Sequence, residues 1–126
     1  MNKICTSINQ SEKLIELGID INTANMYWWS TSKRSYIEAM DDGDFNEAEG
    51  HIPAWSLTAL LGLMPFHIIE NNIRYEFQIV KGLNKEGGTY KIKYKSYTSL
   101  FETLMYNNPI DAAFEMISLL KENNKI

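Results

Sequence analysis

The hydrophobic pattern of this chain changes its period along the sequence, and that change limits the folds available to it. Residues 73–80 and 90–95 alternate apolar and polar side chains, which is typical of half-buried strands. Residues 109–123 instead place apolar side chains three and four positions apart, which is typical of an amphipathic helix. Because strands and helices occupy separate runs, we predict an α+β fold, with a small antiparallel sheet of three or four strands packed against two or three helices.

Three helices are predicted, over residues 8–17, 57–64 and 109–123. Ser7 and Gln10 have the spacing of a capping box at the start of the first helix. Ser56 is a natural N-cap for the second helix, and Pro65 prevents its continuation. Asn108 is a natural N-cap for the third helix. Each predicted helix therefore carries its own start signal.

The two alternating segments are predicted to pair as a hairpin, because Asn84 and two adjacent glycines lie between them. Residues 67–70 are predicted to form a further short strand, and residues 100–106 favour another. In the N-terminal half, residues 27–29 (Tyr-Trp-Trp) resemble the start of a strand. We predict a loop from residue 30 to residue 50 because this stretch is mainly polar and acidic.

The composition excludes several classes of protein. With 44% hydrophobic residues the chain is not generally disordered, and no apolar run approaches the roughly 20 residues of a membrane span. A mass of 14.6 kDa suits a single domain, which we predict to span residues 1–126. The N-terminus lacks the apolar stretch of a secretion signal, so we expect a cytoplasmic protein with no membrane partner. The single cysteine, Cys5, excludes an intramolecular disulfide.

An acidic loop is predicted at residues 38–50, which contain no lysine or arginine. Its six acidic residues are Glu38, Asp41, Asp42, Asp44, Glu47 and Glu49. A calcium loop of the EF-hand type starting at Asp42 fails, because Glu47 falls where glycine is required and Pro53 where a bidentate glutamate belongs. A solvated loop is favoured over weak divalent-ion binding and over docking to a basic partner. We predict no metal and no cofactor.

The two histidines, His51 and His67, support only an alternative function. His51 follows Glu47 and Glu49, but such alternate spacing brings three metal ligands together only in particular backbone conformations. His67 has apolar neighbours, and packing in a strand is favoured over a role as general base. No nucleophile accompanies either histidine in a recognisable pattern, so we assign no catalytic residue. A small enzyme or small-ligand binder that uses one of them with a carboxylate is the alternative hypothesis.

The tryptophans are the strongest interaction candidates, because large aromatic side chains are enriched at binding hot spots. In an extended segment Trp28 and Trp29 face opposite ways, so one can be buried while the other is partly exposed. Packing is nevertheless favoured over binding for both. Trp55 precedes the N-cap Ser56 and is placed to pack on Leu60 as a hydrophobic staple, which is favoured over a contribution to a binding surface.

The predicted hairpin carries a local positive charge on an acidic protein of net charge −4. Between residues 81 and 95 five lysines stand against one glutamate, which leaves +4. Alternation places Lys91, Lys93 and Lys95 on one face and the aromatic residues on the other. A solvated face that protects an outer strand is favoured, ahead of contact with an acidic protein. Nucleic-acid binding is the third hypothesis, because a stacking platform needs cations and aromatics within reach of one strand.

Three segments of the sequence carry a resemblance to a known family. They are residues 10–20 (QSEKLIELGID), 52–57 (IPAWSL) and 108–113 (NPIDAA). Together they resemble a family of small uncharacterised proteins encoded by gut bacteria and by their phages or integrated elements. The family has no established activity, so the resemblance implies an accessory or mobile-element setting and transfers no site. Because no catalytic pattern is found, the acidic and basic segments are separated and residues 27–29 form an aromatic run, we expect a non-enzymatic protein-interaction or accessory module.

Overall fold

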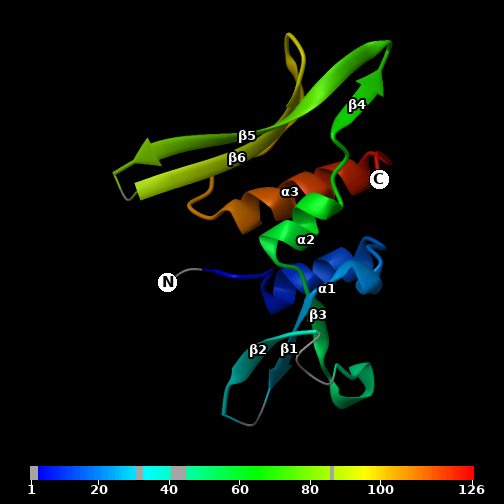
Figure 1. Ribbon diagram of the computed structural model, residues 1–126, viewed down its shortest axis with the longest axis vertical. Helices are drawn as coiled ribbons and strands as arrows, with labels where there is room; N and C mark the ends of the chain where they lie inside the picture. The colour runs from blue at the N-terminus through cyan, green and yellow to red at the C-terminus, as the bar shows by residue number, and fades with distance from the viewer. Residues whose placement is uncertain (1–2, 31–32, 41–44, 86) are drawn as a thin grey trace.

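The computed structural model describes residues 3–30, 33–40, 45–85 and 87–126 (Figure 1). These residues form three α-helices and two antiparallel sheets, which confirms the predicted α+β class. The elements are, in chain order, α1 (Ile8–Glu16), η1 (Ile21–Thr23), β1 (Met26–Ser30), β2 (Ser35–Ala39), η2 (Glu47–Glu49), β3 (Ile52–Ala54), α2 (Leu57–Gly62), β4 (His67–Glu70), β5 (Ile73–Asn84), β6 (Gly87–Lys95), β7 (Ser99–Glu102) and α3 (Pro109–Glu122).

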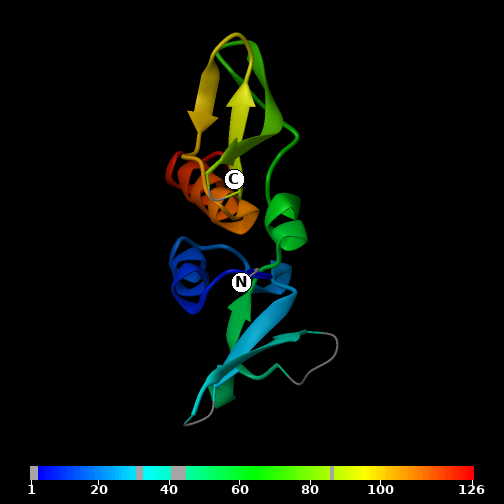
Figure 2. The same ribbon diagram turned by 90° about the vertical axis from the view of Figure 1, so that its left-hand side faces the viewer.

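The helices form a middle layer between the two sheets. In Figure 1 the sheet that contains β5 lies at the top, and α3 and α2 lie below it. Helix α1 lies below these two helices and above the sheet that contains β1. The view turned by 90° in Figure 2 shows the same order of layers. None of the helices in the described ranges combines the length and apolar character that crossing a bilayer requires.

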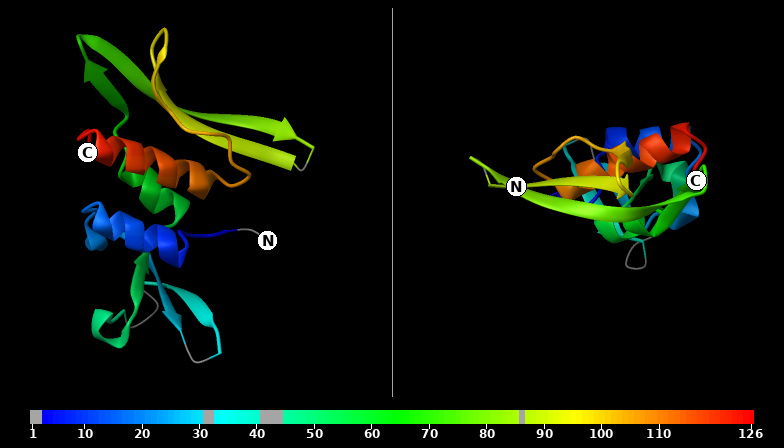
Figure 3. Two further views of the ribbon diagram at one scale, coloured as in Figure 1. Left: turned by 180° about the vertical axis from the view of Figure 1, so that it is seen from behind. Right: turned by 90° about the horizontal axis from the view of Figure 1, so that it is seen from above.

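The upper sheet has four strands in the order β4-β5-β6-β7, and α3 packs on its inner face. Ile92 and Tyr94 of β6 lie in one buried cluster with Ile117 and Leu120 of α3. The predicted hairpin and the short strand at residues 67–70 are confirmed. The hairpin β5–β6 extends past the end of α3, as both panels of Figure 3 show.

The lower sheet has three strands in the order β2-β1-β3 and includes a segment that we predicted to be a loop. Residues 35–39 form β2, so the predicted loop from residue 30 to residue 50 is wrong over this stretch. The physical reason is cross-strand pairing, because β2 sets Tyr36 opposite Trp29 and Ile37 opposite Trp28. Aromatic and β-branched pairs stabilise neighbouring strands, and they outweigh the polar flanks here.

The helices begin at the predicted capping residues. Ser7 Oγ accepts a hydrogen bond from the backbone N of Gln10 at 3.1 Å, and Gln10 Oε1 accepts one from the backbone N of Ser7 at 3.0 Å. The side chain of Ser56 accepts a hydrogen bond from the backbone N of Ala59 and that of Asn108 accepts one from the backbone N of Ile110, so these residues cap α2 and α3. Helix α2 ends at Gly62, two residues before the predicted end.

Trp55 joins the lower sheet to the helical layer. It follows β3 directly, and its backbone N donates a hydrogen bond to Thr6 Oγ1 at 3.1 Å. Thr6 N donates in return to the carbonyl O of Trp55 at 2.9 Å. The indole Nε1 of Trp55 donates to Thr23 Oγ1 at 2.9 Å, and its ring lies in the main buried cluster with Leu60. One side chain thus contributes to both halves of the molecule.

Candidate interaction surface

The predicted tryptophans lie in three different environments. Trp55 is fully buried, with 0% of its surface exposed, so it has no area with which to contact a partner. Trp28 is half-buried, and its Nε1 donates a hydrogen bond to the carbonyl O of Thr6 at 2.9 Å. Trp29 is also half-buried and lies on the opposite face of β1, as strand alternation predicts. Each tryptophan thus packs within the fold.

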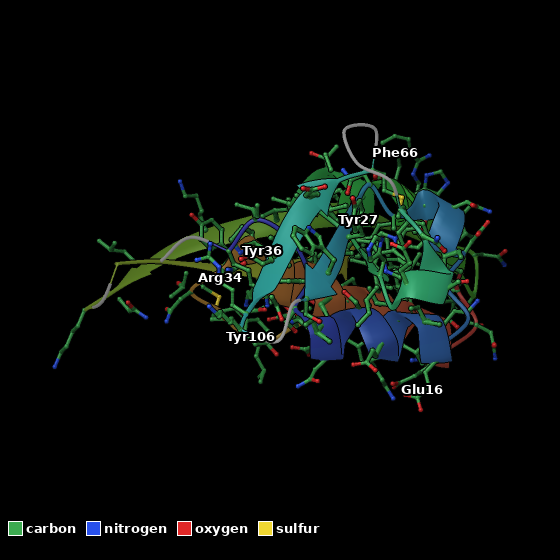
Figure 4. All side chains as sticks on the ribbon, turned by 90° about the horizontal axis from the view of Figure 1, so that it is seen from below. Glu16, Tyr27, Arg34, Tyr36, Phe66 and Tyr106 are labelled. Carbon is green, nitrogen blue, oxygen red and sulfur yellow. The ribbon has the colours of Figure 1, made fainter. Side chains whose placement is uncertain are left out.

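Trp29 belongs to a short stack of side chains at the end of the lower sheet. Its ring stacks on that of Tyr36, with 4.3 Å between the centroids and 18° between the planes. The guanidinium carbon of Arg34 lies 4.6 Å from the centroid of the Tyr36 ring, which is a cation–π distance. Figure 4 shows Tyr36 and Arg34 next to each other on the sheet. Among the described residues, the buried Nε1 of Trp29 has no hydrogen-bond partner.

Tyr27 extends this packing along the same face of β1. The His51 ring stacks on it at 4.9 Å between centroids, and the Phe45 ring meets it edge-on at 5.6 Å. The Tyr27 hydroxyl donates a hydrogen bond to Glu38 Oε2 at 2.8 Å. We call Tyr27, Trp29, Tyr36, Phe45 and His51 the aromatic cluster. Each member is buried or half-buried, so the cluster is a small second core and not an open docking surface.

His51 also borders a hollow of about 330 Å³ beside α1 and β3. The hollow is lined by Glu12, Ile15, Glu16, Glu47, His51, Ile52 and Pro53. The imidazole Nδ1 accepts a hydrogen bond from the backbone N of Asn46 at 3.0 Å. Its Nε2 lies 3.8 Å from Glu49 Oε2, which exceeds a hydrogen-bond distance. The hollow is acidic, but it holds no preassembled acid–base pair.

His67 lies in β4 opposite Glu76 of β5. The Glu76 carboxylate instead accepts a hydrogen bond from Arg74 Nε at 2.7 Å. His67 has no hydrogen bond or ion pair with any residue in the described part of the chain. The carboxylate or nucleophile that the alternative hypothesis requires at His67 is therefore not assembled there.

The predicted acidic loop is divided between regular structure and residues outside the described ranges. Glu38 lies in β2, and Glu47 and Glu49 lie in η2. Asp41, Asp42 and Asp44 lie outside the described residues. Within residues 3–30, 33–40, 45–85 and 87–126, no three His, Cys, Asp or Glu side chains are grouped so that they could hold a metal ion.

The three lysines of β6 lie on the outer face of the upper sheet, while Ile92 and Tyr94 are buried on the inner face. This confirms the predicted separation of charges and aromatics along the strand. The predicted protection of an outer strand is wrong, because β6 lies between β5 and β7. Lys91 is ion-paired with Glu102, and hydrogen bonds from Lys91 and Ser99 lower the pKa of that carboxyl.

Lys81, in β5, does not follow the separation seen in β6. It lies on the inner face, where its Nζ is 5.9 Å from the centroid of the Tyr90 ring. Lys81 and Lys85 are both exposed, and neither forms an ion pair with a described residue. The hairpin therefore presents positive charge beside the edge of β5 that faces away from β6.

That edge of β5 is only partly covered, because β4 is much shorter than β5. β4 pairs with Ile73–Glu76, and the backbone N of Phe77 donates to the carbonyl O of Phe66 at 3.1 Å. Beyond Phe77, no strand in the described ranges pairs with β5 on this side. Backbone groups alternate in direction along a strand, so every second residue after Phe77 points its N–H and C=O to the same edge. These residues are Ile79, Lys81 and Leu83.

The pairing of β6 supports this assignment. Tyr90 stands opposite Lys81, and its backbone N donates to the carbonyl O of Tyr106 at 2.6 Å, away from β5. Lys81 and Tyr90 thus form a non-hydrogen-bonded pair of the antiparallel ladder. The N–H and C=O of Lys81 consequently face away from β6. We call the backbone of Ile79, Lys81 and Leu83 the free edge of β5.

Exposed apolar side chains surround the free edge. Ile79 is 45% exposed and Leu83 is 85% exposed, because the hairpin extends past the helices at this end (Figure 3). At the Phe77 end lies an apolar hollow of about 130 Å³, beside Phe66, which is 90% exposed. Its lining residues are Leu61, Met64, Pro65, Phe66 and Phe77. Contiguous exposed apolar surface of this kind is typical of interaction sites.

The free edge was not predicted from the sequence. The alternation of residues 73–80 predicted β5, but the length of the neighbouring strand β4 depends on where the chain turns, at Pro65 and at Asn72. One signal was present in the sequence, because the apolar alternation continues to Ile79 and Leu83 whereas the strand predicted at residues 67–70 is short.

Cys5 is not a reactive site. The thiol is 1% exposed, and burial raises its pKa from 9.0 to about 11. A thiol with this pKa stays protonated at neutral pH, and the thiolate is the nucleophilic form. Cys5 therefore packs as a small buried side chain.

No known protein family matches this chain, and no curated protein or solved structure matches it either.

Proposed function

We propose that this protein is a non-enzymatic protein-interaction module that binds an extended segment of a partner at the free edge of β5. The observation that carries the proposal is the run of backbone groups at Ile79, Lys81 and Leu83 that no strand within the described ranges pairs on this side. Such an edge suits strand addition, in which main-chain hydrogen bonds supply affinity and side-chain pockets supply specificity.

The free edge has few of the features that normally prevent association between strands. Edge strands are usually short, bulged, covered, interrupted by proline or charged, often with lysine. β5 spans 12 residues and has no proline, and its register with β6 is regular from Glu76 to Asn84. Lys81 is the one charged residue on the free edge, and Ile79 and Leu83 beside it are exposed. These properties favour pairing with another chain.

Leu83→Pro tests the proposal. Proline removes a backbone N–H that faces the free edge and leaves the hydrogen bonds to β6 intact, and proline is tolerated at such edge positions. In affinity purification from the native host, we expect the wild-type protein to retain a protein partner that Leu83→Pro loses. Trp29→Ala is the control, because Trp29 lies in the lower sheet and should not affect this binding. Capture of no partner, or equal capture by Leu83→Pro, contradicts the proposal.

The acidic hollow beside His51 favours a second candidate function, the binding of a small organic cation. Three glutamates line the hollow over a floor of Ile15, Ile52 and Pro53, and none of the three is ion-paired with a described residue. Titration with arginine amide, monitored by NMR, should shift the His51 resonances in the wild type and not in Glu16→Gln. Unchanged His51 resonances in the wild type would remove this candidate.

The setting is part of the proposal. We infer that the protein acts in the cytoplasm, as an accessory protein of a phage or mobile element. The buried, unpaired thiol of Cys5 supports a reducing compartment, and the resemblance of three sequence segments supports the mobile-element setting. Fractionation of the native host should recover the protein with cytoplasmic markers.

A further inference from the structure

We propose that the partner segment at the free edge of β5 is an extended strand that carries an acidic side chain between two apolar ones on the face that meets Ile79, Lys81 and Leu83. This inference rests on the proposed function and adds the chemistry of the partner. It follows from three features of the edge: the place left beside β4, the apolar surface on the inner face, and the lysines of the hairpin.

The place for the incoming strand is set by β4. β4 runs antiparallel to β5, and the chain leaves this line at Phe66 and Pro65 to join α2. An added strand can therefore continue the line of β4 alongside Ile79–Leu83, which extends β4 to the length of β5. Neighbouring strands lie about 4.8 Å apart, so its side chains would stand next to those of β5 on both faces.

The inner face favours apolar residues in the partner. Ile79 and Leu83 point to this face, and the apolar hollow lies at the end of the edge nearest β4. A partner residue beside Ile79 would reach toward Phe66 and Leu61, which line that hollow. Apolar side chains of the partner beside Ile79 and Leu83 would cover surface that is exposed in the free protein.

The charge of the edge favours acidic residues in the partner. Lys81 lies between Ile79 and Leu83, and Lys85 follows the end of the strand. Neither lysine has an ion pair with a described residue, so both can pair with incoming carboxylates. Opposite charges in neighbouring strands stabilise a pair, and like charges directly opposite destabilise it.

The same lysines disfavour a second copy of this chain as the occupant. Antiparallel pairing of two free edges centred on Lys81 sets this lysine opposite itself, while Ile79 meets Leu83 of the second copy. A shift by one hydrogen-bonded position still leaves the two Lys81 side chains in diagonal positions. Each arrangement also brings two positively charged hairpins together. The geometry therefore points to an acidic partner strand.

Selection from a random dodecapeptide library tests the inference. We expect the wild-type protein to enrich peptides that carry an acidic residue two positions from an apolar residue on each side and have net negative charge. The affinity of a selected peptide should fall at least tenfold for Leu83→Pro and for Lys81→Glu. Lys13→Glu is the matched control, because it makes the same charge change on an exposed residue of α1 and should leave the affinity unchanged. Circular dichroism and the thermal midpoint would establish that the variants are folded.

Each other outcome overturns the inference. Enrichment of neutral or basic peptides, or equal binding to Lys81→Glu, would exclude an acidic strand while leaving the protein-interaction function in place. A dimer in sedimentation that Leu83→Pro dissociates would identify a second copy as the occupant. If no peptide is enriched, the inference fails, and affinity purification of whole proteins decides separately on the proposed function.

Discussion

The two sheets of this molecule are stabilised by different kinds of packing. In the upper sheet, Ile92 and Tyr94 are buried against α3 in a continuous apolar cluster. In the lower sheet, the outer face of β1 is covered by rings stacked on one another, such as Trp29 on Tyr36 and His51 on Tyr27. The first sheet therefore depends on a helix, and the second depends largely on side chains of its own strands and loops.

This difference explains why the long exposed edge belongs to the upper sheet, whereas the edge strands of the lower sheet, β2 and β3, are short. The upper sheet is fixed by its inner face, so β5 and β6 can project beyond α3 without losing their support. The lower sheet has three short strands, and the segment before β3 brings Phe45 and His51 onto its face. A long strand on a firmly packed base can present backbone to a partner, whereas a small sheet needs its side chains for its own stability.

Trp55→Ala should have the largest effect, because Trp55 connects the two halves. Removal of a fully buried aromatic side chain costs about 3–5 kcal/mol of unfolding free energy. Urea denaturation followed by far-ultraviolet circular dichroism measures this loss. Trp55→Phe is the control, which retains a ring and loses the hydrogen bond to Thr23, so its cost should be smaller. Loss of NMR signals from the lower sheet alone would show that Trp55 does not connect the halves.

Alkaline pH should destabilise two parts of the molecule. One is the N-terminal segment at Cys5, next to the Thr6 that bonds Trp55, and the other is the upper half, which contains Tyr94 and Tyr106. Burial raises the pKa of Cys5 to about 11 and also raises that of Tyr94, and the hydrogen bond to Glu115 raises the pKa of Tyr106 to about 12. A raised pKa in the folded state gives stability that is complete below the unfolded pKa and lost as pH rises through the folded value. At 1.36 kcal/mol per pKa unit, the rise of the Cys5 pKa from 9.0 to about 11 alone contributes roughly 3 kcal/mol.

Urea midpoints between pH 8 and pH 11 test this expectation. The midpoint should fall as pH rises above about 9, and part of the fall should disappear in Cys5→Ala. A midpoint that does not change over this range would contradict the assignment of Cys5 and Tyr94 as neutral groups in the folded state.

Much of the upper half was predictable from the sequence. The helix starts at Ser7, Ser56 and Asn108 depend on local capping, and the hairpin depends on an alternating pattern. Both signals are contained within a few neighbouring residues, so these elements can be predicted without knowledge of tertiary contacts. The separation of lysines from buried residues along β6 was predictable for the same reason.

The lower half was less predictable because its stability comes from distant pairs. β2 lacks a strong alternating pattern, and its place depends on Trp29 across the sheet. Phe45 and His51 reach Tyr27 from an irregular segment, which no periodic signal marks. The candidate site could not be predicted for a related reason. The sequence predicts β5, but the free edge exists because β4 is short, and its length is set by the turn that connects it to α2.

The Trp29–Tyr36 stack should contribute a moderate share of the stability of the lower sheet. Stacked aromatic pairs contribute about 0.5–1.5 kcal/mol beyond the area they bury. A double-mutant cycle with Trp29→Ala, Tyr36→Ala and the double variant measures this coupling by urea denaturation. Ile79→Ala and Phe101→Ala, both in the upper sheet, should be additive because no ring contact links them. Additive effects at Trp29 and Tyr36 would show that the stack does not stabilise the lower sheet.

The smallest effect is expected at Glu102, on the outer face of the upper sheet. Hydrogen bonds from Lys91 and Ser99 lower its pKa below the usual 4.5. A lowered pKa gives stability that is present above the unfolded value and lost as pH falls through the folded value, so the contact should weaken only in acid. NMR titration of the Glu102 carboxyl should show its pKa rising toward 4.5 in Lys91→Met, and rising less in Ser99→Ala. Because Glu102 is exposed, Lys91→Met should leave the urea midpoint at pH 7 nearly unchanged, whereas a large fall would mean that the outer face carries stability that we assign to the packing against α3.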